Sequence, residues 1–334
     1  MKEKFMKLSK AMFVIAAFLL VFSTGKTSAK ASVGSVTQIG QTTNSITISW
    51  TKNGNETVYL GYSYIDDIEG RNAAKAMAES MSTPVSGTSY TLSVPQNGIA
   101  YIALTTTSRL GPITYNKKFK CAPSQVTNVH QTEWYRAAHS CVYEWNNQPC
   151  ADGYETVFMD AKGNIIESTT RPSSRYYHDG VKNNKVYKCQ VRAYTDINDR
   201  PEQRIYGEWS PEAYFLTQPG AAPKYGNVSL GLDVHCSKGK LKISWEKVDD
   251  ISGYHVFVAT KKGGKFKKVK TLKAGAKSIT IKKFKKKKIN PKKKYYVFVQ
   301  AFKDANGIRY NSGMNYISYN NGKYSSFMYA DSWN

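Results

Sequence analysis

Apolar and polar residues alternate along many short segments of this chain, which is the pattern of β-strands with one buried face. In three of these segments the inward-facing set ends at a tryptophan, namely Trp50, Trp145 and Trp245. Successive tryptophans are separated by 95 and 100 residues. A strand pattern that returns at this interval predicts a repeated all-β unit, because each copy would need its own hydrophobic core.

Two further features repeat after each tryptophan. A Gly-Tyr pair comes first, and a strand that opens on tyrosine follows; the pairs are Gly61-Tyr62, Gly153-Tyr154 and Gly253-Tyr254, and the opening tyrosines are Tyr101, Tyr187 and Tyr295. Small or β-branched residues alternate after Tyr187 and Tyr295, so we expect these strands to face a core. The tryptophans and these two tyrosines are therefore interpreted as core residues and not as functional ones.

This set of residues resembles the fibronectin type III module. Tyr187 and Tyr295 match the corner tyrosine of that family, and Val181 and Ile289 stand where it has an apolar residue six positions earlier. The resemblance covers residues 34–319. It implies three tandem immunoglobulin-like β-sandwiches, all-β in class, after a signal peptide. The predicted modules span 34–120, 122–218 and 222–319, followed by an aromatic C-terminal tail at 320–334.

The first repeat departs from the family pattern. Trp50 and Tyr62 are 12 residues apart, where the other two repeats have nine. Residues 70–82 also place Ala74, Met77, Ala78 and Met81 at helical spacing, which predicts a short helix packed on the core of this divergent module. A role of this helix in binding is the alternative interpretation.

The N-terminal segment has the pattern of a secretory signal peptide. A basic start precedes 12 apolar residues, 11–22, and Ala29-Lys30-Ala31 is a small-residue cleavage site. We expect residues 1–31 to be removed, and the mature chain to be secreted and extracellular, without a transmembrane segment or covalent anchor. Retention at the cell surface would then be noncovalent. The style of this segment suggests a bacterial protein.

Positive charge is concentrated in one block. The chain has a net charge of +24, and residues 261–294 contain 17 lysines without any acid or arginine. We expect these lysines to gather at one pole of the third module and to bind anionic polymers. The candidate residues are Lys261, Lys262, Lys265, Lys267, Lys268, Lys282, Lys283, Lys285, Lys286, Lys287, Lys288, Lys292, Lys293 and Lys294. The alternative is a solubilising surface that protects edge strands from pairing.

Five cysteines remain after the predicted cleavage, and secretion permits disulfides. Strand positions place Cys141 and Cys189 near one pole of the second module, in opposite sheets, and Cys121 and Cys150 near the other. Each pair is a possible disulfide. The first pair resembles the inter-sheet bond of immunoglobulin domains. Buried reduced thiols are the alternative, and Cys236 has no evident partner.

No sequence pattern supports catalysis. The chain lacks the metal-binding His and Cys spacings, the G-x-S-x-G nucleophile turn and a glycine-rich phosphate loop, so we expect no enzyme activity, no metal and no cofactor. The preferred function is a secreted binding or adhesion protein that engages an anionic polysaccharide or a teichoic acid-like polymer. The alternative is a soluble ligand of host or cell-surface protein receptors. Sequence-specific nucleic-acid binding is disfavoured, because lysine lacks the bidentate geometry of arginine.

Overall fold

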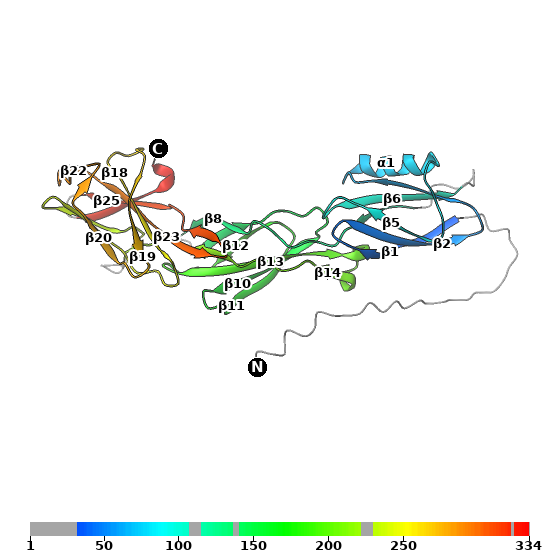
Figure 1. The fold of residues 1–334 in the computed structure, drawn as a ribbon, viewed down its shortest axis with the longest axis horizontal. Helices are drawn as coiled ribbons and strands as arrows, with labels where there is room; N and C mark the ends of the chain where they lie inside the picture. Colours follow the sequence, from blue (N-terminus) through cyan, green and yellow to red (C-terminus); the bar gives the residue numbers. More distant parts are fainter. Residues whose placement is uncertain (1–31, 107–114, 136–139, 222–229, 322–323, 334) are drawn as a thin grey trace.

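The computed structural model describes residues 32–106, 115–135, 140–221, 230–321 and 324–333. The predicted signal peptide therefore lies outside the described residues. Three β-sandwiches follow one another in a row, with the first module at one end and the third at the other (Figure 1). Each sandwich encloses its own cluster of buried apolar side chains.

The first module pairs its strands as β1-β2-β5 in one sheet and β4-β3-β6-β7 in the other. Its elements are β1 (Ser32–Gln41), β2 (Ser45–Asn53), β3 (Val58–Ser63), α1 (Ile68–Glu79), β4 (Pro84–Val85), β5 (Ser89–Ser93), β6 (Ile99–Thr106) and β7 (Tyr115–Lys120). Alternate residues of β2 are buried and end at Trp50, as a strand with one core face requires.

The second module repeats this order, with sheets β12-β9-β8 and β11-β10-β13-β14, and β15 also paired with β13. Its elements are β8 (His130–Tyr135), β9 (Ser140–Glu144), β10 (Gly153–Asp160), β11 (Ile165–Arg171), β12 (Arg175–Asp179), β13 (Val186–Asp196), two short 3-10 turns (Ile197–Asp199 and Pro201–Gln203), β14 (Arg204–Tyr206) and β15 (Ala213–Leu216).

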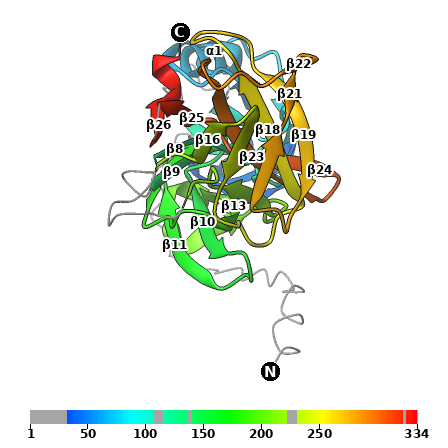
Figure 2. The ribbon, with the colours of Figure 1, turned by 90° about the vertical axis from the view of Figure 1, so that its left-hand side faces the viewer.

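The third module has sheets β16-β17-β20 and β19-β18-β23-β25-β26, with β24 also paired with β23. Its elements are β16 (Asp233–Ser237), β17 (Lys240–Ser244), β18 (Gly253–Ala259), β19 (Lys267–Lys273), β20 (Ser278–Ile281), the small hairpin β21 (Lys283–Phe284) and β22 (Lys287–Lys288), β23 (Tyr296–Ala305), β24 (Ile308–Asn311), β25 (Tyr316–Asn321), β26 (Tyr324–Tyr329) and a 3-10 turn (Ala330–Ser332). Figure 2 faces this module and shows β19 and β26 at opposite sides of their sheet.

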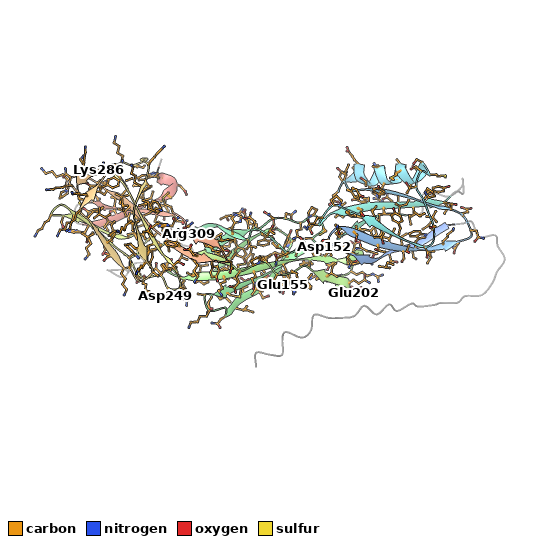
Figure 3. The ribbon with its side chains drawn as sticks, viewed as in Figure 1. Asp152, Glu155, Glu202, Asp249, Lys286 and Arg309 are labelled. Atoms are coloured by element: carbon orange, nitrogen blue, oxygen red, sulfur yellow. The ribbon has the colours of Figure 1, made fainter. Side chains whose placement is uncertain are left out.

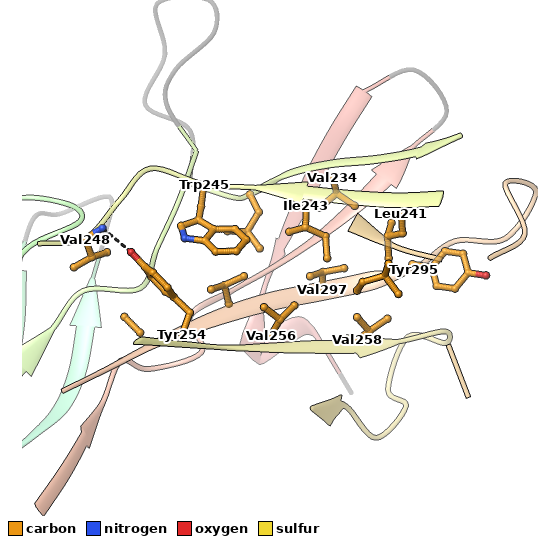
Figure 4. Packing of buried hydrophobic residues seen from close by; sticks show 14 of the residues in the cluster. Val234, Leu241, Ile243, Trp245, Val248, Tyr254, Val256, Val258, Tyr295 and Val297 are labelled. Carbon is orange, nitrogen blue, oxygen red and sulfur yellow. Dashed lines mark hydrogen bonds between the residues drawn. The ribbon is translucent and has the colours of Figure 1, made fainter. Parts of the chain in front are cut away.

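The repeated Trp and Tyr residues form the same contact in the second and third modules. The rings of Trp245 and Tyr254 meet edge to face at 5.3 Å, and the Tyr254 hydroxyl accepts a hydrogen bond of 2.8 Å from the amide of Val248 (Figure 4). Trp145 and Tyr154 repeat the ring geometry at 5.3 Å. Aromatic pairs of this kind add about 0.5–1.5 kcal/mol to the free energy of burial.

Helix α1 covers the outer face of the second sheet of the first module. The helix begins two residues before the predicted start at residue 70 and ends three residues before the predicted end at residue 82. Asp67 caps its first turn, because its side chain accepts a hydrogen bond of 2.9 Å from the Gly70 amide. The contact surface is made of small residues, Ala74 and Ala78 from the helix and Ala103 from β6. A Cβ on Gly61 would overlap the backbone of this helix.

Hydrogen bonds as well as the covalent chain join neighbouring modules. Between the first and second modules, the backbone amide of Gln38 donates a hydrogen bond of 3.0 Å to Asn198 Oδ1. Between the second and third, Gln218 Nε2 donates to the carbonyl oxygen of Tyr316 at 2.8 Å. Because both polar contacts are wholly or partly buried, we expect each junction to resist bending.

Replacing Gly61 by Ala should detach α1 from its sheet, because the added methyl group overlaps helix backbone that cannot rotate away. We expect a cost of roughly 1–3 kcal/mol, the usual range for overpacking. Hydrogen exchange followed by mass spectrometry should show faster exchange of the α1 amides in Gly61→Ala. The control is Gly275→Ala, since a Cβ there meets no atom within 4 Å. Unchanged α1 exchange in Gly61→Ala would contradict the tight packing.

Candidate polyanion-binding pole

All 17 lysines of residues 261–294 are exposed, and three segments carry them. One group follows β18, a second lies along β19 and in the turn after it, and the third surrounds the β21–β22 hairpin and the loop before β23. Within the described part of the chain, none of these lysines forms an ion pair with an acid. Their positive charge is therefore balanced mainly by counterions from solvent.

Strand register brings the ends of these segments together. Ala259, the last residue of β18, pairs with Tyr296, the first residue of β23. The loop that starts after Ala259 therefore begins beside the loop that ends at Lys294. Leu241 and Ile281 also pair, which places the start of β17 beside the segment that enters the hairpin. We call the end of the module where these loops meet the lysine pole.

A buried phenylalanine fixes the β21–β22 hairpin to the core. Phe284 has an exposed fraction of 7% and belongs to the main core cluster of the third module. Its strand neighbours are paired as Lys283 with Lys288, so the two residues at the tip are Lys285 and Lys286. Figure 3 labels Lys286 at the end of the third module that lies away from the other two modules.

The tip residues have an uncommon backbone conformation. The φ angles of Lys285 and Lys286 are 48° and 66°, both in the left-handed region. Two-residue hairpin turns of this kind favour Asn-Gly, because a side chain with a Cβ costs roughly 1–2 kcal/mol there. This turn therefore places two lysines at positions where other residues would stabilise the module.

A tyrosine corner orders the loop that follows the hairpin. The Tyr295 hydroxyl accepts a hydrogen bond of 3.0 Å from the amide of Asn290. Ile289 is buried, with an exposed fraction of 3%, and its amide donates to the Lys282 carbonyl oxygen at 3.1 Å. The lysines on both sides of Ile289 consequently lie on a loop that hydrogen bonds and a buried side chain keep in place.

The structure adds two lysines that the sequence analysis missed. The tight turn between β16 and β17 carries Lys238 and Lys240, both exposed, with Lys238 and Gly239 at positive φ. Because Lys240 precedes Leu241, which pairs with Ile281, this turn lies at the lysine pole. The Lys-Gly-Lys sequence is a turn signal, but only the register shows which pole it joins.

One expectation about the lysines is wrong. We expected all of them at one pole, but Lys273 pairs with Gly253, at the opposite end of β18 from Ala259. The carbonyl oxygen of Lys277 accepts a hydrogen bond of 3.0 Å from the backbone amide of Trp245, near the second module. The physical reason is that β19 runs along the full length of β18, so its lysines extend from one pole to the other. Lys267 lies near the lysine pole, opposite Val258.

The C-terminal residues pack beside the lysine pole. Strand β26 extends the sheet by pairing with β25. Trp333 then stacks on Phe266 with ring centroids 4.7 Å apart and contacts Tyr296 at 5.1 Å. These residues form a separate small core with Ile317, and Phe266 follows directly on Lys265. We infer that Trp333 fixes the loop that carries Lys261, Lys262 and Lys265.

The four paired-cysteine candidates are buried thiols in this structure. Cys141 and Cys189 belong to the core of the second module, whereas Cys121 and Cys150 belong to the cluster around Trp50 of the first. The disulfides remain predictions. Within the described ranges, no three His, Cys, Asp or Glu side chains are grouped as a metal ion requires. No helix of the described chain is long and apolar enough to span a membrane.

The chain aligns with a structure of chicken CNTN1 domains FN1–FN3 at 13% identity and a TM-score of 0.30, covering 90% of this chain and 99% of the other. The fold is that of tandem fibronectin type III modules. In all three, a three-stranded sheet of the first, second and fifth strands faces a second sheet with the third and sixth strands at its centre, when the small β21–β22 hairpin of the third module is left out of the count.

Two other solved structures align over part of the chain. A two-domain fibronectin type III segment of chicken tenascin matches at 12% identity and TM-score 0.30, covering 55% of this chain and 99% of the other. A cytokine receptor complex matches at 15% identity and TM-score 0.30, covering 57% of this chain and 98% of the other. No protein-family model and no curated protein matches the chain. At these TM-scores the alignments carry no argument about function.

Replacing Trp333 by Ala should loosen the loop between β18 and β19, because the indole is the buried partner of Phe266. Hydrogen exchange of peptides from residues 260–266 should accelerate, while β20 and β23 stay protected. Tyr329→Ala is the control, since that side chain has an exposed fraction of 52%. Equal exchange at 260–266 in wild type and Trp333→Ala would show that the C-terminal segment does not support the lysine pole.

Proposed function

We propose that this chain is a secreted, non-catalytic binding protein whose third module engages anionic polymers through the lysine pole. The anionic polymer would be an acidic polysaccharide or a teichoic acid-like polymer of a cell surface. The first and second modules would then extend away from that surface. Protein of this kind would be retained by charge, and high salt would release it.

The observation that carries this proposal is the turn at Lys285 and Lys286. Lysines that only keep a surface soluble can occupy any exposed position. Here two of them occupy left-handed positions that disfavour them, on a hairpin anchored by buried Phe284. Local strain of this kind is concentrated at functional sites, where a gain in binding offsets the loss in stability.

Lysine in place of arginine determines the expected selectivity. An ammonium group is a point charge, whereas a guanidinium group binds phosphate or carboxylate in a fixed bidentate geometry. The lysine pole should therefore attract phosphate, sulfate and carboxylate polymers by charge density, with weak dependence on their sequence. Binding should be sensitive to salt, because each contact releases condensed counterions.

Replacing the two lysines at the hairpin tip tests the proposal directly. The double variant Lys285→Asn/Lys286→Gly restores the favoured turn, so we expect the third module to become more stable by roughly 1–2 kcal/mol. We expect affinity for a teichoic acid-type polymer to fall in the same variant. Chemical denaturation monitored by exchange of β20 and β23 amides measures the first effect, and titration at fixed salt measures the second.

The control removes the same charge from the other end of the module. Lys273→Gln/Lys277→Gln lowers the net charge by the same two units but leaves the lysine pole intact. We expect this control to bind nearly as tightly as wild type. Equal losses in both variants would mean that net charge alone matters, and unchanged binding in the turn variant would favour a purely solubilising role.

Salt dependence gives a second, independent test. If about five lysines contact a phosphate polymer, the affinity should fall with salt at a log–log slope of roughly −4. The turn variant should lower the size of this slope by about 1–2, because it removes two contacts. A slope near zero, or elution from heparin resin at or below about 0.15 M salt, would contradict the proposal.

A further inference from the structure

The junction between the first two modules buries two thiols from different modules in one core. Cys121 follows β7 directly, and Cys150 lies in the second-module loop between β9 and β10. Both side chains have an exposed fraction of 0% and belong to the hydrophobic cluster around Trp50. Cys150 is thus a residue of the second module that completes the core of the first.

The backbones of the two cysteines are bound to neighbouring points of a single loop. The amide of Cys150 donates to the carbonyl oxygen of Asn97 at 2.9 Å, and that of Cys121 donates to the carbonyl oxygen of Gly98 at 3.1 Å. Successive Cα atoms are only about 3.8 Å apart. Both backbones are therefore anchored to adjacent residues of one loop. A disulfide requires Cα atoms about 4.4–6.8 Å apart, which is the separation that this anchoring favours.

We infer that Cys121 and Cys150 form a disulfide bond that fastens the second module to the first. The surrounding contacts already hold the bridge region in place. Lys120, beside Cys121, forms an ion pair of 2.6 Å with Asp152, two residues after Cys150. Thr195 donates to the Cys150 carbonyl oxygen at 2.8 Å. The bond would add a covalent constraint to a junction that these polar contacts have already aligned.

The oxidation proceeds by exchange with a disulfide such as oxidised glutathione. One protein thiolate attacks that disulfide, forms a mixed disulfide and releases one glutathione thiolate. The second protein thiolate then displaces the other glutathione and completes the Cys121–Cys150 bond. Two protein thiols are oxidised, one glutathione disulfide is reduced to two thiols, and the two protein protons pass to the released thiolates or to solvent.

Burial determines when this exchange can occur. Desolvation raises the pKa of Cys121 to about 11 and that of Cys150 to about 12, and the neighbouring Cys121 is among the causes of the second shift. The thiolate is the attacking species. The folded, reduced junction should therefore oxidise slowly, and the bond should form while the chain is folding and the thiols are still exposed.

Peptide mapping of the full mature chain tests the inference. One sample is refolded from denaturant in a glutathione redox buffer, and a second is folded under reducing conditions before the same buffer is added. Both are acid-quenched and alkylated, then cut with trypsin and a Glu-specific protease. Cleavage after Lys120 and Glu144 separates Cys121, Cys141 and Cys150 into different peptides. We expect the Cys121–Cys150 linked peptide in the refolded sample, and at least tenfold less in the folded one at early times.

Variants separate this bond from the other cysteines. Cys236→Ser should leave the linked peptide unchanged, because that thiol lies in the third module. Adding reductant should accelerate hydrogen exchange of residues 147–152 in wild type, but not in Cys150→Ser. Alkylation of both Cys121 and Cys150 in the refolded sample would overturn the inference. A link from either one to Cys141 or Cys189, or glutathione on both without a link, would overturn it equally.

Discussion

The hydrogen bond from the Asn290 amide to the Tyr295 hydroxyl, at 3.0 Å, is the contact on which the lysine pole depends. Phe284 and Ile289 are buried on the same stretch of chain. Two ammonium groups about 7 Å apart repel by roughly 0.6 kcal/mol in water. Burying one Phe or Ile side chain contributes about 1.5–3 kcal/mol. The buried anchors can therefore offset several repulsive lysine pairs and keep a highly charged loop folded.

Bonded junctions extend this local order along the molecule. The first and second modules share a core cluster through Cys150. The second and third are joined by Gln218 and by a tilted contact between the rings of Tyr214 and Tyr310, with centroids 5.4 Å apart. A charged pole at one end and a helix-covered module at the other are consequently held apart in a fixed arrangement. This separation suits a protein that is retained by one end and exposes the other.

The fold could be read from the sequence because its determinants are local and repeat. Trp145 and Trp245 fall at the end of short alternating strands, and the tyrosine corner is encoded within seven residues. The lysine pole was predicted less completely. Lys238 and Lys240 join it, and Lys273 and Lys277 leave it, because strand pairing between distant segments decides both. The C-terminal support by Trp333 also depends on a long-range contact with Phe266 that no local pattern encodes.

We propose that a folded pole, and not the net charge of the chain, binds the polyanion. Lysine-specific acylation with and without a saturating phosphate polymer, read by mass spectrometry, tests it most directly. We expect that Lys240, Lys262 and Lys286 become protected by the polymer, while Lys188, Lys247 and Lys303 react at unchanged rates. Uniform protection of all exposed lysines, or protection at none, would contradict it.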